Sequence, residues 1–539
     1  MQQQEIFDLF EFLSMDNLDI PTEKRKNVVK TAHLLANSWD KFSKEAQENV
    51  LNALKNLSHT RAPFQGAMVQ SMLYSVTKKR LYLKKAAAFI EQANCDLAAS
   101  NATFNSISGQ LFNASPETRQ FLDREFNRSF RSRMLQKNMA RVKWVRDQLI
   151  DGPSTPFERN NRVVVLAKQL LRPPHAPSMD ALNFARTLIT EHNKEVLLIV
   201  TWELANDYDG MWVPCSHFNR EDSFFGKQSI TFDGTVIPLY MAGDGIFDEQ
   251  TAGRSIAAIN QFNPEMILSV SSPSLIAEAF NKDKFCFIYP TNGGVPLTKG
   301  CYFHTWGQLE QADIKVIEDF NLKDQFLFSQ HPGFEQKQRH STLTRQQFGM
   351  PEDAFVFVIV GLRLDQDVND SFLDLLEQIA CHPKAQFAFV GIFNSFEKML
   401  DQRPLLRKKC AFLNLQTDMM AVYHISDAFL NPMRQGGGSS VVYAMQAALP
   451  VLSTPYGDIG VAMKDFPKLE NYAAMATVAL QIIDDQALYT EYGTLSEKEA
   501  PKFTGQSRFI ARIIEEFEKY AENRAASASL VDLPMQVIA

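Results

Sequence analysis

The sequence has no apolar stretch that approaches the roughly 20 residues a helix needs to cross a bilayer. Its longest apolar runs, Val163–Leu171 and Phe355–Leu362, have the length of a strand. The first residues carry acids before any base and lack the pattern of a cleaved signal peptide. We therefore expect a soluble protein of the cytoplasm.

Cysteine is also scarce. The six cysteines include no Cys-x-x-Cys pair, which excludes a disulfide scaffold and a zinc ribbon and favours a reducing compartment. Cys286 and Cys381 lie in or beside apolar runs, where we expect them to be buried as small hydrophobic side chains. Positive charge is not in excess either: 55 basic and 62 acidic residues give a net charge of −7. This balance excludes a general nucleic-acid-binding protein.

The chain is long enough for several domains, because 539 residues exceed what one hydrophobic core organises. In residues 1–150, apolar residues recur at three- and four-residue spacings, as at Val28, Val29 and Ala32. Ser115 precedes a proline in the pattern of a helix start. We predict an all-helical domain over 1–150.

One helix expected in this region, over 119–147, holds nine basic residues and only three acidic ones. The basic residues are Arg119, Arg124, Arg128, Arg131, Arg133, Lys137, Arg141, Lys143 and Arg146. Such a run is typical of a solvated helix face. The alternative is a docking face for an anionic partner, either a lipid headgroup at a membrane surface or an acidic acceptor. Few aromatic residues lie among the bases, so nucleic acid is not favoured.

A turn-rich linker at Asp151–Pro156 precedes strands that are apolar on both faces and alternate with helices. This alternation predicts parallel sheets covered on both sides. We predict two doubly wound, Rossmann-like α/β domains over 157–340 and 341–505, a terminal helix over 506–524 and a loose tail over 525–539. The expected strands are 162–167, 195–201, 235–241, 266–270 and 285–289 in the first domain, and 355–360, 386–390, 409–413, 428–430 and 451–453 in the second.

The most informative loop follows the strand that ends at Leu430, since ligands of doubly wound sheets bind beyond the carboxyl ends of the strands. Three glycines permit close approach of the backbone, and two serines open a helix whose N-terminal N–H groups attract a phosphate. Arg434 is expected to add a charge-assisted hydrogen bond. The residues expected to bind a phosphate or diphosphate are Gly436, Gly437, Gly438, Ser439 and Ser440. A flexible turn with a serine cap is the alternative.

The segment 343–463 resembles the donor-binding domain of GT-B glycosyltransferases, and glycosyltransferase family 4 in particular. The similar stretches are Thr344–Phe355, Gly361–Leu364, Asn431–Gly438 and Ala444–Val451. This resemblance implies a GT-B architecture, in which the second α/β domain binds a nucleotide sugar and the first binds the acceptor. It also implies that the terminal helix crosses back to the first α/β domain.

Two positions depart from the family pattern. Many family 4 enzymes carry two glutamates across this loop, one near the donor sugar and one on the ribose, and here Gln435 and Tyr443 occupy those positions. Both side chains can still hydrogen-bond a hydroxyl group, but neither brings a negative charge. Arg363, in the turn that matches the family, is expected to neutralise the diphosphate. The alternative for it is an ordinary ion pair with Asp365 or Asp367.

Three histidines are candidates for catalysis. His175 lies in a proline-stiffened loop after the first strand, where we expect it at the cleft between the α/β domains as a general base or to orient the acceptor. His331, near the domain junction, is a second candidate and His304 a third. A structural role is the alternative for each of them.

Two pairs of acids match the Asp-x-Asp pattern that holds a metal in GT-A glycosyltransferases: Asp207 with Asp209, and Asp365 with Asp367. A three-residue pattern recurs by chance, and the second pair follows a turn that resembles the metal-independent class. We predict no catalytic metal and no cofactor besides the nucleotide-sugar donor.

Together these features predict metal-independent transfer of a hexose, glucose by preference, from a UDP-sugar to a glycan or glycoprotein. The helical domain resembles those of soluble bacterial protein-glycosylating enzymes, which implies recognition of a large acceptor, such as a sugar already attached to a protein. One alternative is a catalytically silent GT-B scaffold, which Gln435 and Tyr443 favour. The other is capsule or lipopolysaccharide synthesis at the membrane face, with helix 119–147 as the anchor.

Overall fold

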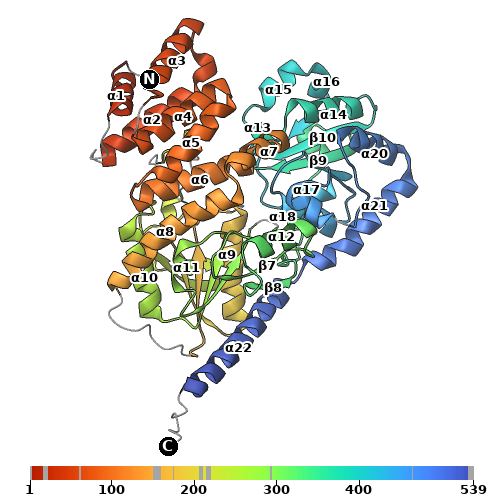
Figure 1. Cartoon of the computed structure of the whole chain (residues 1–539). Coiled ribbons are helices and arrows are strands. Elements are labelled where there is room, and N and C mark those ends of the chain that lie inside the picture. Colours follow the sequence, from red (N-terminus) through yellow and green to blue (C-terminus); the bar gives the residue numbers. More distant parts are fainter. Residues whose placement is uncertain are drawn as a thin grey trace, which may run out of the picture.

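The computed structural model of the chain describes residues 3–15, 22–59, 62–149, 159–173, 175–204, 210–213, 220–291, 294–463 and 465–531. Figure 1 shows an N-terminal group of helices, two α/β domains and a long final helix. The expected linker Asp151–Pro156 and residues 532–539 of the expected tail lie outside the described residues.

The N-terminal region is helical, as predicted. Its helices are α1 (Gln3–Ser14), α2 (Thr22–Asn37), α3 (Lys44–Leu57), α4 (Pro63–Thr77), α5 (Arg80–Gln92), α6 (Leu97–Asn113), α7 (Pro116–Glu125) and α8 (Arg128–Leu149), with a 3₁₀ turn η1 at Trp39–Lys41. Polar side chains fix several starts: Asp96 accepts a hydrogen bond from the Ala99 N–H of α6, and Ser115 from the Thr118 N–H of α7. The first part of α4 is buried on all sides, so the other helices pack around it.

The expected single helix over 119–147 is two helices. α7 ends at Glu125 and α8 begins at Arg128. The break has a local cause, because the Asn127 side chain accepts a hydrogen bond from the Phe130 N–H at 2.9 Å and so caps a new helix start.

Eight strands form the sheet of the first α/β domain. They are β1 (Arg162–Ala167), β2 (Glu195–Val200), β3 (Ser229–Phe232), β4 (Thr235–Met241), β5 (Met266–Val270), β6 (Phe285–Tyr289), β7 (Tyr302–Thr305) and β8 (Phe326–Ser329), in the spatial order β3-β4-β2-β1-β5-β6-β7-β8. Every neighbouring pair is parallel except the hairpin β3–β4. In the centre, Val165 pairs with Leu198 and Leu268, and all three are fully buried. This is the parallel sheet that the apolar runs predicted.

Helices cover both faces of this sheet. On one face α9 (Ala176–Thr190) packs with the final helix α22 (Gln506–Val531), and the ring of Phe184 contacts those of Tyr289 and Phe509. On the other face lie α10 (Glu249–Phe262), α11 (Leu275–Phe280) and α8. The helix α8 therefore forms part of the first α/β domain's outer layer. A smaller cluster includes α12 (Gln311–Asp319), and a 3₁₀ turn η2 lies at Asp222–Phe224.

The second α/β domain has a five-stranded parallel sheet in the order β11-β10-β9-β12-β13. Its strands are β9 (Phe355–Gly361), β10 (Ala385–Gly391), β11 (Cys410–Phe412), β12 (Ala428–Leu430) and β13 (Val451–Leu452). Its helices are α13 (Leu364–Asp367), α14 (Asp370–Ala380), α15 (Phe396–Gln402), α16 (Pro404–Arg407), α17 (Met419–His424), α18 (Gly438–Gln446), α19 (Gly457–Ala462), α20 (Tyr472–Asp484) and α21 (Gln486–Glu499), with 3₁₀ turns η3 (Arg345–Phe348) and η4 (Ala500–Phe503). Two Rossmann-like domains in tandem make the GT-B architecture that the sequence predicted.

The chain crosses between the two α/β domains twice, and the two crossings lie against each other. The Phe334 N–H donates to the Phe503 carbonyl at 2.6 Å, and the Gly505 N–H donates to the Phe334 carbonyl at 3.3 Å. Gly333 has φ +77°, and a Cβ atom there would lie 2.7 Å from the carbonyl carbon of Gly505. Glycine at this position is therefore what lets the two crossings touch.

After the second crossing, α22 returns to the first α/β domain and runs along it (Figure 1). Its apolar residues Phe509, Ile513 and Phe517 are buried in the core of that domain. The helix was expected to end near residue 524, but it extends to Val531. The alanine-rich sequence that was taken for a loose tail has high helix propensity.

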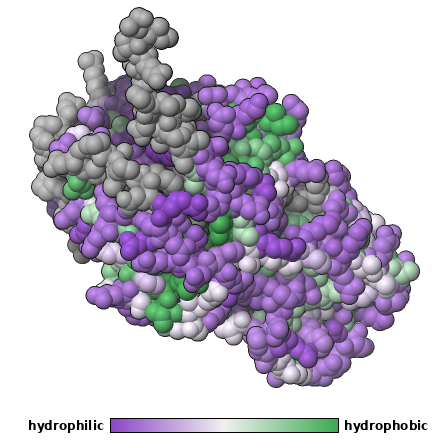
Figure 2. Space-filling view, turned by 90° about the horizontal axis from the view of Figure 1, so that it is seen from below, coloured by the Kyte–Doolittle hydropathy of each residue, from purple (hydrophilic) through white to green (hydrophobic). Residues whose placement is uncertain are grey.

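The expectation that two cysteines are buried holds for one of them. Cys286 is buried, but Cys381 is exposed, because it follows the last buried turn of α14. Among the described residues, no helix is long and apolar enough to span a membrane. The face in Figure 2 is mainly hydrophilic, with hydrophobic residues in small separate groups.

Candidate functional site

The glycine-rich loop joins β12 to α18 at the carboxyl edge of the second sheet. Gly436 and Gly437 have φ angles of +83° and +86°, in the left-handed region that favours glycine. Gly437 precedes the helix, which begins at Gly438. Because the first N–H groups of a helix have no partner within the helix, the backbone at Gly437–Ser440 offers hydrogen-bond donors, and the helix dipole adds attraction for an anion.

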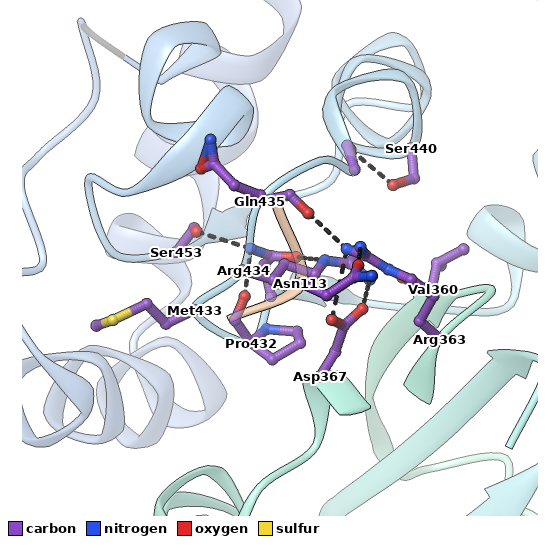
Figure 3. Close-up of polar contacts among 12 residues, drawn as sticks. Asn113, Val360, Arg363, Asp367, Pro432, Met433, Arg434, Gln435, Ser440 and Ser453 are labelled. Atoms are coloured by element: carbon purple, nitrogen blue, oxygen red, sulfur yellow. Dashed lines mark hydrogen bonds and ion pairs between the residues drawn. The ribbon is translucent and has the colours of Figure 1, made fainter. Parts of the chain in front are cut away.

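Arg434 lies beneath this loop, contrary to the expectation that it would face the anion (Figure 3). Its Nε donates to Asn431 Oδ1 at 3.1 Å, its Nη1 to the carboxylate of Asp367 at 3.1 Å, and its Nη2 to the Val360 carbonyl at 2.7 Å. The side chain is buried, and this burial lowers its pKa while Asp367 opposes the shift. A buried guanidinium must have its N–H groups satisfied, so Arg434 supports the loop from inside.

Arg363 follows β9 and lies above the same loop. Its Nη2 donates to the Gln435 carbonyl at 2.7 Å and lies 3.6 Å from the Asp367 carboxylate. Its Nη1 donates to the side-chain oxygen of Asn113, and its guanidinium carbon lies 4.9 Å from the centroid of the Phe112 ring. Arg363 therefore lies beside the glycine loop, and it also contacts Asp367, the ion pair that was the alternative. Phe112 and Asn113 end α6, so the helical region reaches the loop directly.

The other loop residues either stabilise the loop itself or lie at the boundary between the domains. Ser440 Oγ donates to the Gly437 carbonyl at 2.8 Å and the Ser440 carbonyl accepts from the Tyr423 hydroxyl at 2.9 Å. Ser439 and Gln435 are partly buried on the loop. Tyr443 was expected beside a ribose, but its ring packs on Phe334 at 5.9 Å between centroids, and so it faces the crossing between the domains.

A cavity of about 520 Å³ opens at the carboxyl ends of β10 and β11, along the same edge of the sheet. Its lining includes the aromatic side chains of Phe393, Phe396 and Phe412, the amides of Asn394 and Asn414, and the carboxylate of Glu397. Aromatic faces together with amide groups can hold a flat, polar ring.

The acids of the second Asp-x-Asp pair have separate structural partners. The Asp365 carboxylate accepts hydrogen bonds from the backbone N–H groups of Asn394 and Ser395, at 2.9 and 2.7 Å, which lowers its pKa. Asp367 pairs with Arg434 and Arg363. Asp207 and Asp209 lie outside the described residues. Among those that the structure describes, no group of three or more His, Cys, Asp or Glu side chains could hold a metal ion.

Residues 341–492 match the family model described as "Glycosyl transferases group 1". This segment therefore resembles the domain of group 1 glycosyltransferases, and it is called the glycosyltransferase domain below. No curated protein matches the chain. The glycosyltransferase domain contains the glycine loop, Arg363 and the cavity.

Solved structures of GT-B glycosyltransferases are similar to the chain at low identity. Anabaena HepE in complex with UDP has 13% identity and a TM-score of 0.49, over 66% of this chain and 100% of that one. A Thermobaculum terrenum O-GlcNAc transferase mutant has 11% identity and a TM-score of 0.48, over 98% and 100%. A TarM variant of S. aureus, in complex with fondaparinux, alpha-GlcNAc-glycerol and UDP, has 10% identity and a TM-score of 0.44, over 66% and 99%.

Two of the candidate histidines lie in the first α/β domain: His175 in the loop after its first strand and His304 in its core. His175 has both ring nitrogens in contact with neighbours, Nδ1 with Ser178 Oγ at 2.7 Å and Nε2 with the Gln169 amide at 3.1 Å, and burial lowers its pKa to about 4. His304 is fully buried between aromatic rings, and burial lowers its pKa to about 3. These side chains are held as neutral structural groups.

His331 lies at the domain junction, as predicted, but its ring is enclosed. It packs against Trp306, Phe334 and Phe503 at centroid distances of 5.3, 5.1 and 4.5 Å, and burial lowers its pKa to about 3. Nδ1 accepts the Gly333 N–H at 3.3 Å, so the proton of the neutral ring is on Nε2. In this state the ring can donate a hydrogen bond but has no free nitrogen to take a proton.

Three residues of the first α/β domain that sequence reasoning missed lie at the boundary with the glycosyltransferase domain. Trp306, just after β7, would lie 3.5 Å from a Cβ atom at Gly438. Tyr289 ends β6 and is hydrogen-bonded to Asp180, near the start of α9. The charge of Asp180 also raises the pKa of Tyr443 in α18. No local motif marks these three residues, because the two domains bring them together.

Elsewhere the carboxyl edge of the first sheet is closed by α6. The Glu203 carboxylate, after β2, accepts the Leu275 N–H at 2.6 Å and the Ser274 hydroxyl at 3.2 Å. The Glu203 carbonyl accepts the side-chain amides of Asn101 and Asn105 of α6, at 2.8 and 2.6 Å. These buried polar groups are satisfied by one another.

The basic residues of α8 bind other parts of the protein. Arg128 donates to the carbonyls of Val295 and Pro296, at 2.9 and 2.5 Å. Arg133 pairs with Glu91, Arg141 with Glu249 and Arg146 with Asp283. These contacts fasten α8 to α5 and to the first α/β domain.

Proposed function

We propose that the protein transfers a neutral hexose from a nucleoside diphosphate sugar to a hydroxyl group of a glycan or glycoprotein acceptor, at the boundary between its two α/β domains. The observation that carries this proposal is the glycine loop at the start of α18, with Arg363 above it, inside the group 1 glycosyltransferase domain. An anion held there would be the diphosphate that leaves the sugar.

Charge develops on this diphosphate as the bond from the sugar breaks. Fixed donors that already point at the leaving oxygen stabilise the transition state more than the ground state. The backbone N–H groups of Gly437–Ser440 would supply such donors, and Arg363 would supply a permanent positive charge. Arg434 would keep the loop in the conformation that presents them, through its bond to Asn431 and its ion pair with Asp367.

The nucleoside would occupy the cavity at β10 and β11. Neighbouring strands of a sheet lie about 4.8 Å apart, so β10, two strands from β12, places the cavity roughly 10 Å from the glycine loop. A nucleoside joins its base to the diphosphate over a comparable span. The aromatic and amide groups of the cavity, such as Phe393 and Asn414, suit a flat base with polar edges.

We propose UDP-glucose as the first donor to test and transfer without a metal or another cofactor. Gln435 lies where an amide can both donate to and accept from hydroxyl groups, which suits a neutral hexose. Asp365 and Asp367 are held by the 394–395 backbone and by two arginines, so the second Asp-x-Asp pair is already occupied.

The contact between the helical region and the donor loop supports a large acceptor. A Cβ atom at Gly436 would lie 3.5 Å from the ring of Phe112 in α6. We propose that these helices border the route of an approaching acceptor and contact a glycan or glycoprotein outside the reacting sugar.

The test is a panel of UDP-, GDP- and ADP-sugars, each offered with free glycans and glycoproteins, with transfer measured by mass spectrometry. We expect transfer from a UDP-hexose that continues in excess EDTA. Binding of nucleotide without any turnover would favour the silent scaffold instead. Loss of turnover in EDTA with recovery in Mn²⁺ would refute the metal-independent mechanism.

A further inference from the structure

One carboxylate beside the cavity at β10 and β11 has no role in the proposed transfer so far. Asp365 lies in α13 and binds the loop that follows β10. Its Oδ1 accepts from the Ser395 N–H at 2.7 Å and from the Ser395 hydroxyl at 2.6 Å. Its Oδ2 accepts from the Asn394 N–H at 2.9 Å and from the Asn394 side-chain amide at 3.0 Å. Because Asn394 lines the cavity, these four hydrogen bonds fix part of its wall.

The same hydrogen bonds orient the side-chain amide of Asn394. Burial alone would raise the pKa of Asp365, but the hydrogen bonds from Ser395 and Asn394 outweigh it and lower the pKa. An ionised carboxylate only accepts hydrogen bonds, so the Asn394 atom that contacts it is Nδ2. The Asn394 Oδ1 branches away from this contact, and no donor among the described residues binds it. Oδ1 is therefore available to a molecule in the cavity.

We propose that Asp365 holds Asn394 as the acceptor of a hydrogen bond from the N3–H of uracil, so that the two residues together select a uridine nucleotide. This inference rests on the proposed glycosyl transfer, in which the nucleoside occupies the cavity. Uracil carries one ring N–H on its polar edge, between two carbonyl groups. The N3 atom of cytosine has no hydrogen, so cytosine in the same place would set two acceptors against each other. Asn394 contacts the base, and Asp365 is a positioning residue that acts through it.

The cavity also offers apolar side chains to the faces of a base. Ile392 and Leu415 line it at the ends of the adjacent strands β10 and β11, and they are 44% and 48% exposed. Phe396 and Phe412 line it as well, with 5.2 Å between their ring centroids. Covering such side chains with a flat ring removes apolar surface from water, which is favourable. The polar edge of the base is then left for the amide of Asn394.

The ends of three neighbouring strands are tied together around this wall. The Ile392 N–H donates to the Gly361 carbonyl at 3.1 Å, and the Gly391 N–H donates to the Asn414 carbonyl at 3.0 Å. Gly391 has φ +128°, and a Cβ atom there would lie 1.8 Å from the Gly361 carbonyl oxygen, so only glycine fits. A site that is rigid before binding discriminates better, because it cannot turn another group toward the wrong base.

The other acidic group at the cavity is less suited to this role. Glu397 has a side chain that is 77% exposed, and its partner Arg407 lies 3.5 Å away. Water therefore competes for its carboxylate, and a single weak ion pair does not fix its position. The acceptor that the fold holds in one orientation is the Asn394 amide.

Calorimetry on the unaltered protein tests the hydrogen bond with UDP, CDP and 3-methyl-UDP, in which a methyl group replaces the N3 hydrogen. We expect CDP and 3-methyl-UDP to bind at least about tenfold more weakly than UDP, because the acceptor is left unpaired. The control is 5-methyl-UDP, which keeps N3–H and should bind within about threefold of UDP. Equal affinity for UDP and 3-methyl-UDP overturns the inference and leaves the proposed transfer intact. A protein that binds no nucleotide and transfers no sugar refutes the proposed function itself.

Variants test the two residues. Asn394→Ala removes the acceptor, and Asp365→Asn frees the Asn394 amide to turn, so both should bind UDP about three- to tenfold more weakly and lose most of the preference over 3-methyl-UDP. At saturating donor, kcat should stay within about twofold, because the base lies away from the reacting atoms. The matched control is Asp353→Asn, an exposed aspartate before β9 at the opposite edge of the same sheet, which should behave normally. An Asp365→Asn protein that discriminates as well as this control overturns the inference.

The N3 proton gives a readout that a merely structural role of Asp365 would not move. In UDP labelled with ¹⁵N at N3, a hydrogen bond to Asn394 slows exchange of this proton with water, so the bound nucleotide should show its NMR signal. Asn394→Ala with saturating UDP should lose the signal, and Asp365→Asn should weaken it. Exchange in the unaltered protein as fast as in free UDP would contradict the assignment.

Discussion

The guanidinium of Arg363 lies over the ring of Phe112, with 4.9 Å between its central carbon and the ring centroid. The first residue belongs to the glycosyltransferase domain and the second to the end of α6. Because Arg363 also donates to the Gln435 carbonyl, the helical region takes part in positioning the donor loop. The end of α6 is thus in direct contact with the arginine that holds the proposed donor loop.

This contact predicts an effect on donor binding. Phe112→Ala removes a cation–π interaction worth about 0.5–1 kcal/mol, and Arg363 becomes less well oriented. We expect UDP to bind about two- to fivefold more weakly, as measured by calorimetry. Phe7→Ala, at an exposed phenylalanine of α1, is the control and should bind normally. Equal affinity in both variants would show that α6 does not support the donor site.

The glycine loop should not tolerate a side chain at Gly437. In Gly437→Val the new Cβ would lie 2.8 Å from the Arg434 guanidinium, in a backbone conformation with φ +86°. We expect UDP binding at least tenfold weaker. Gly349→Val controls for backbone strain, since Gly349 has φ +70° with no atom within 4 Å of a new Cβ. Normal UDP affinity in Gly437→Val would show that the diphosphate does not bind at this loop.

The basic residues of α8 should act on stability. Arg146 and Asp283 form an ion pair with only 14% and 13% of their side chains exposed, and breaking a buried pair from one side costs about 3–5 kcal/mol at full burial. Arg146→Glu should therefore lower the melting temperature by several degrees. Arg124→Glu, at an exposed residue of α7, should change it little. Loss of binding to anionic vesicles with an unchanged melting temperature would instead support the membrane-face interpretation.

Stability should fall in mild acid because of the buried histidines. Burial lowers the pKa of His304 and of His331 to about 3, below the value of about 6.5 in an unfolded chain. The unfolded chain therefore binds more protons, and the folded state loses up to about 1.4 kcal/mol per histidine for each pH unit below 6.5, until about pH 3. Melting temperatures measured from pH 7 to 4 should show this decline. His304→Phe should make it shallower, and an unchanged slope would contradict the assignment.

The alternation of helices and strands could be predicted because parallel strands buried on both faces are continuous apolar runs. β1 and β6 are of this kind, and every residue of β6 is buried. β7 and β8 were missed because Tyr302–Thr305 and Phe326–Ser329 are short and end in polar residues. Such segments become strands only because the sheet extends to include them.

The glycine loop could also be predicted, since its glycines and serines lie within a few residues of one another. The position of Arg434 could not, because Asp367, which draws it inward, comes from α13, the short helix that follows a different strand, β9. No local sequence pattern could have identified Asp180 and Trp306. They belong to one domain and meet residues of the other, so only the packed structure makes them neighbours.

The return of α22 to the first α/β domain sets the order in which the protein can be made. β8 ends at Ser329 and α22 begins at Gln506, so the whole glycosyltransferase domain is translated between them. Translation proceeds at about 5–20 residues per second. The apolar surface that Phe509 and Phe517 later cover is therefore exposed on the nascent chain for on the order of ten to thirty seconds. Of the two α/β domains, the one that is synthesised first is therefore completed last, and a gene fragment that stops before α22 will yield an aggregating product.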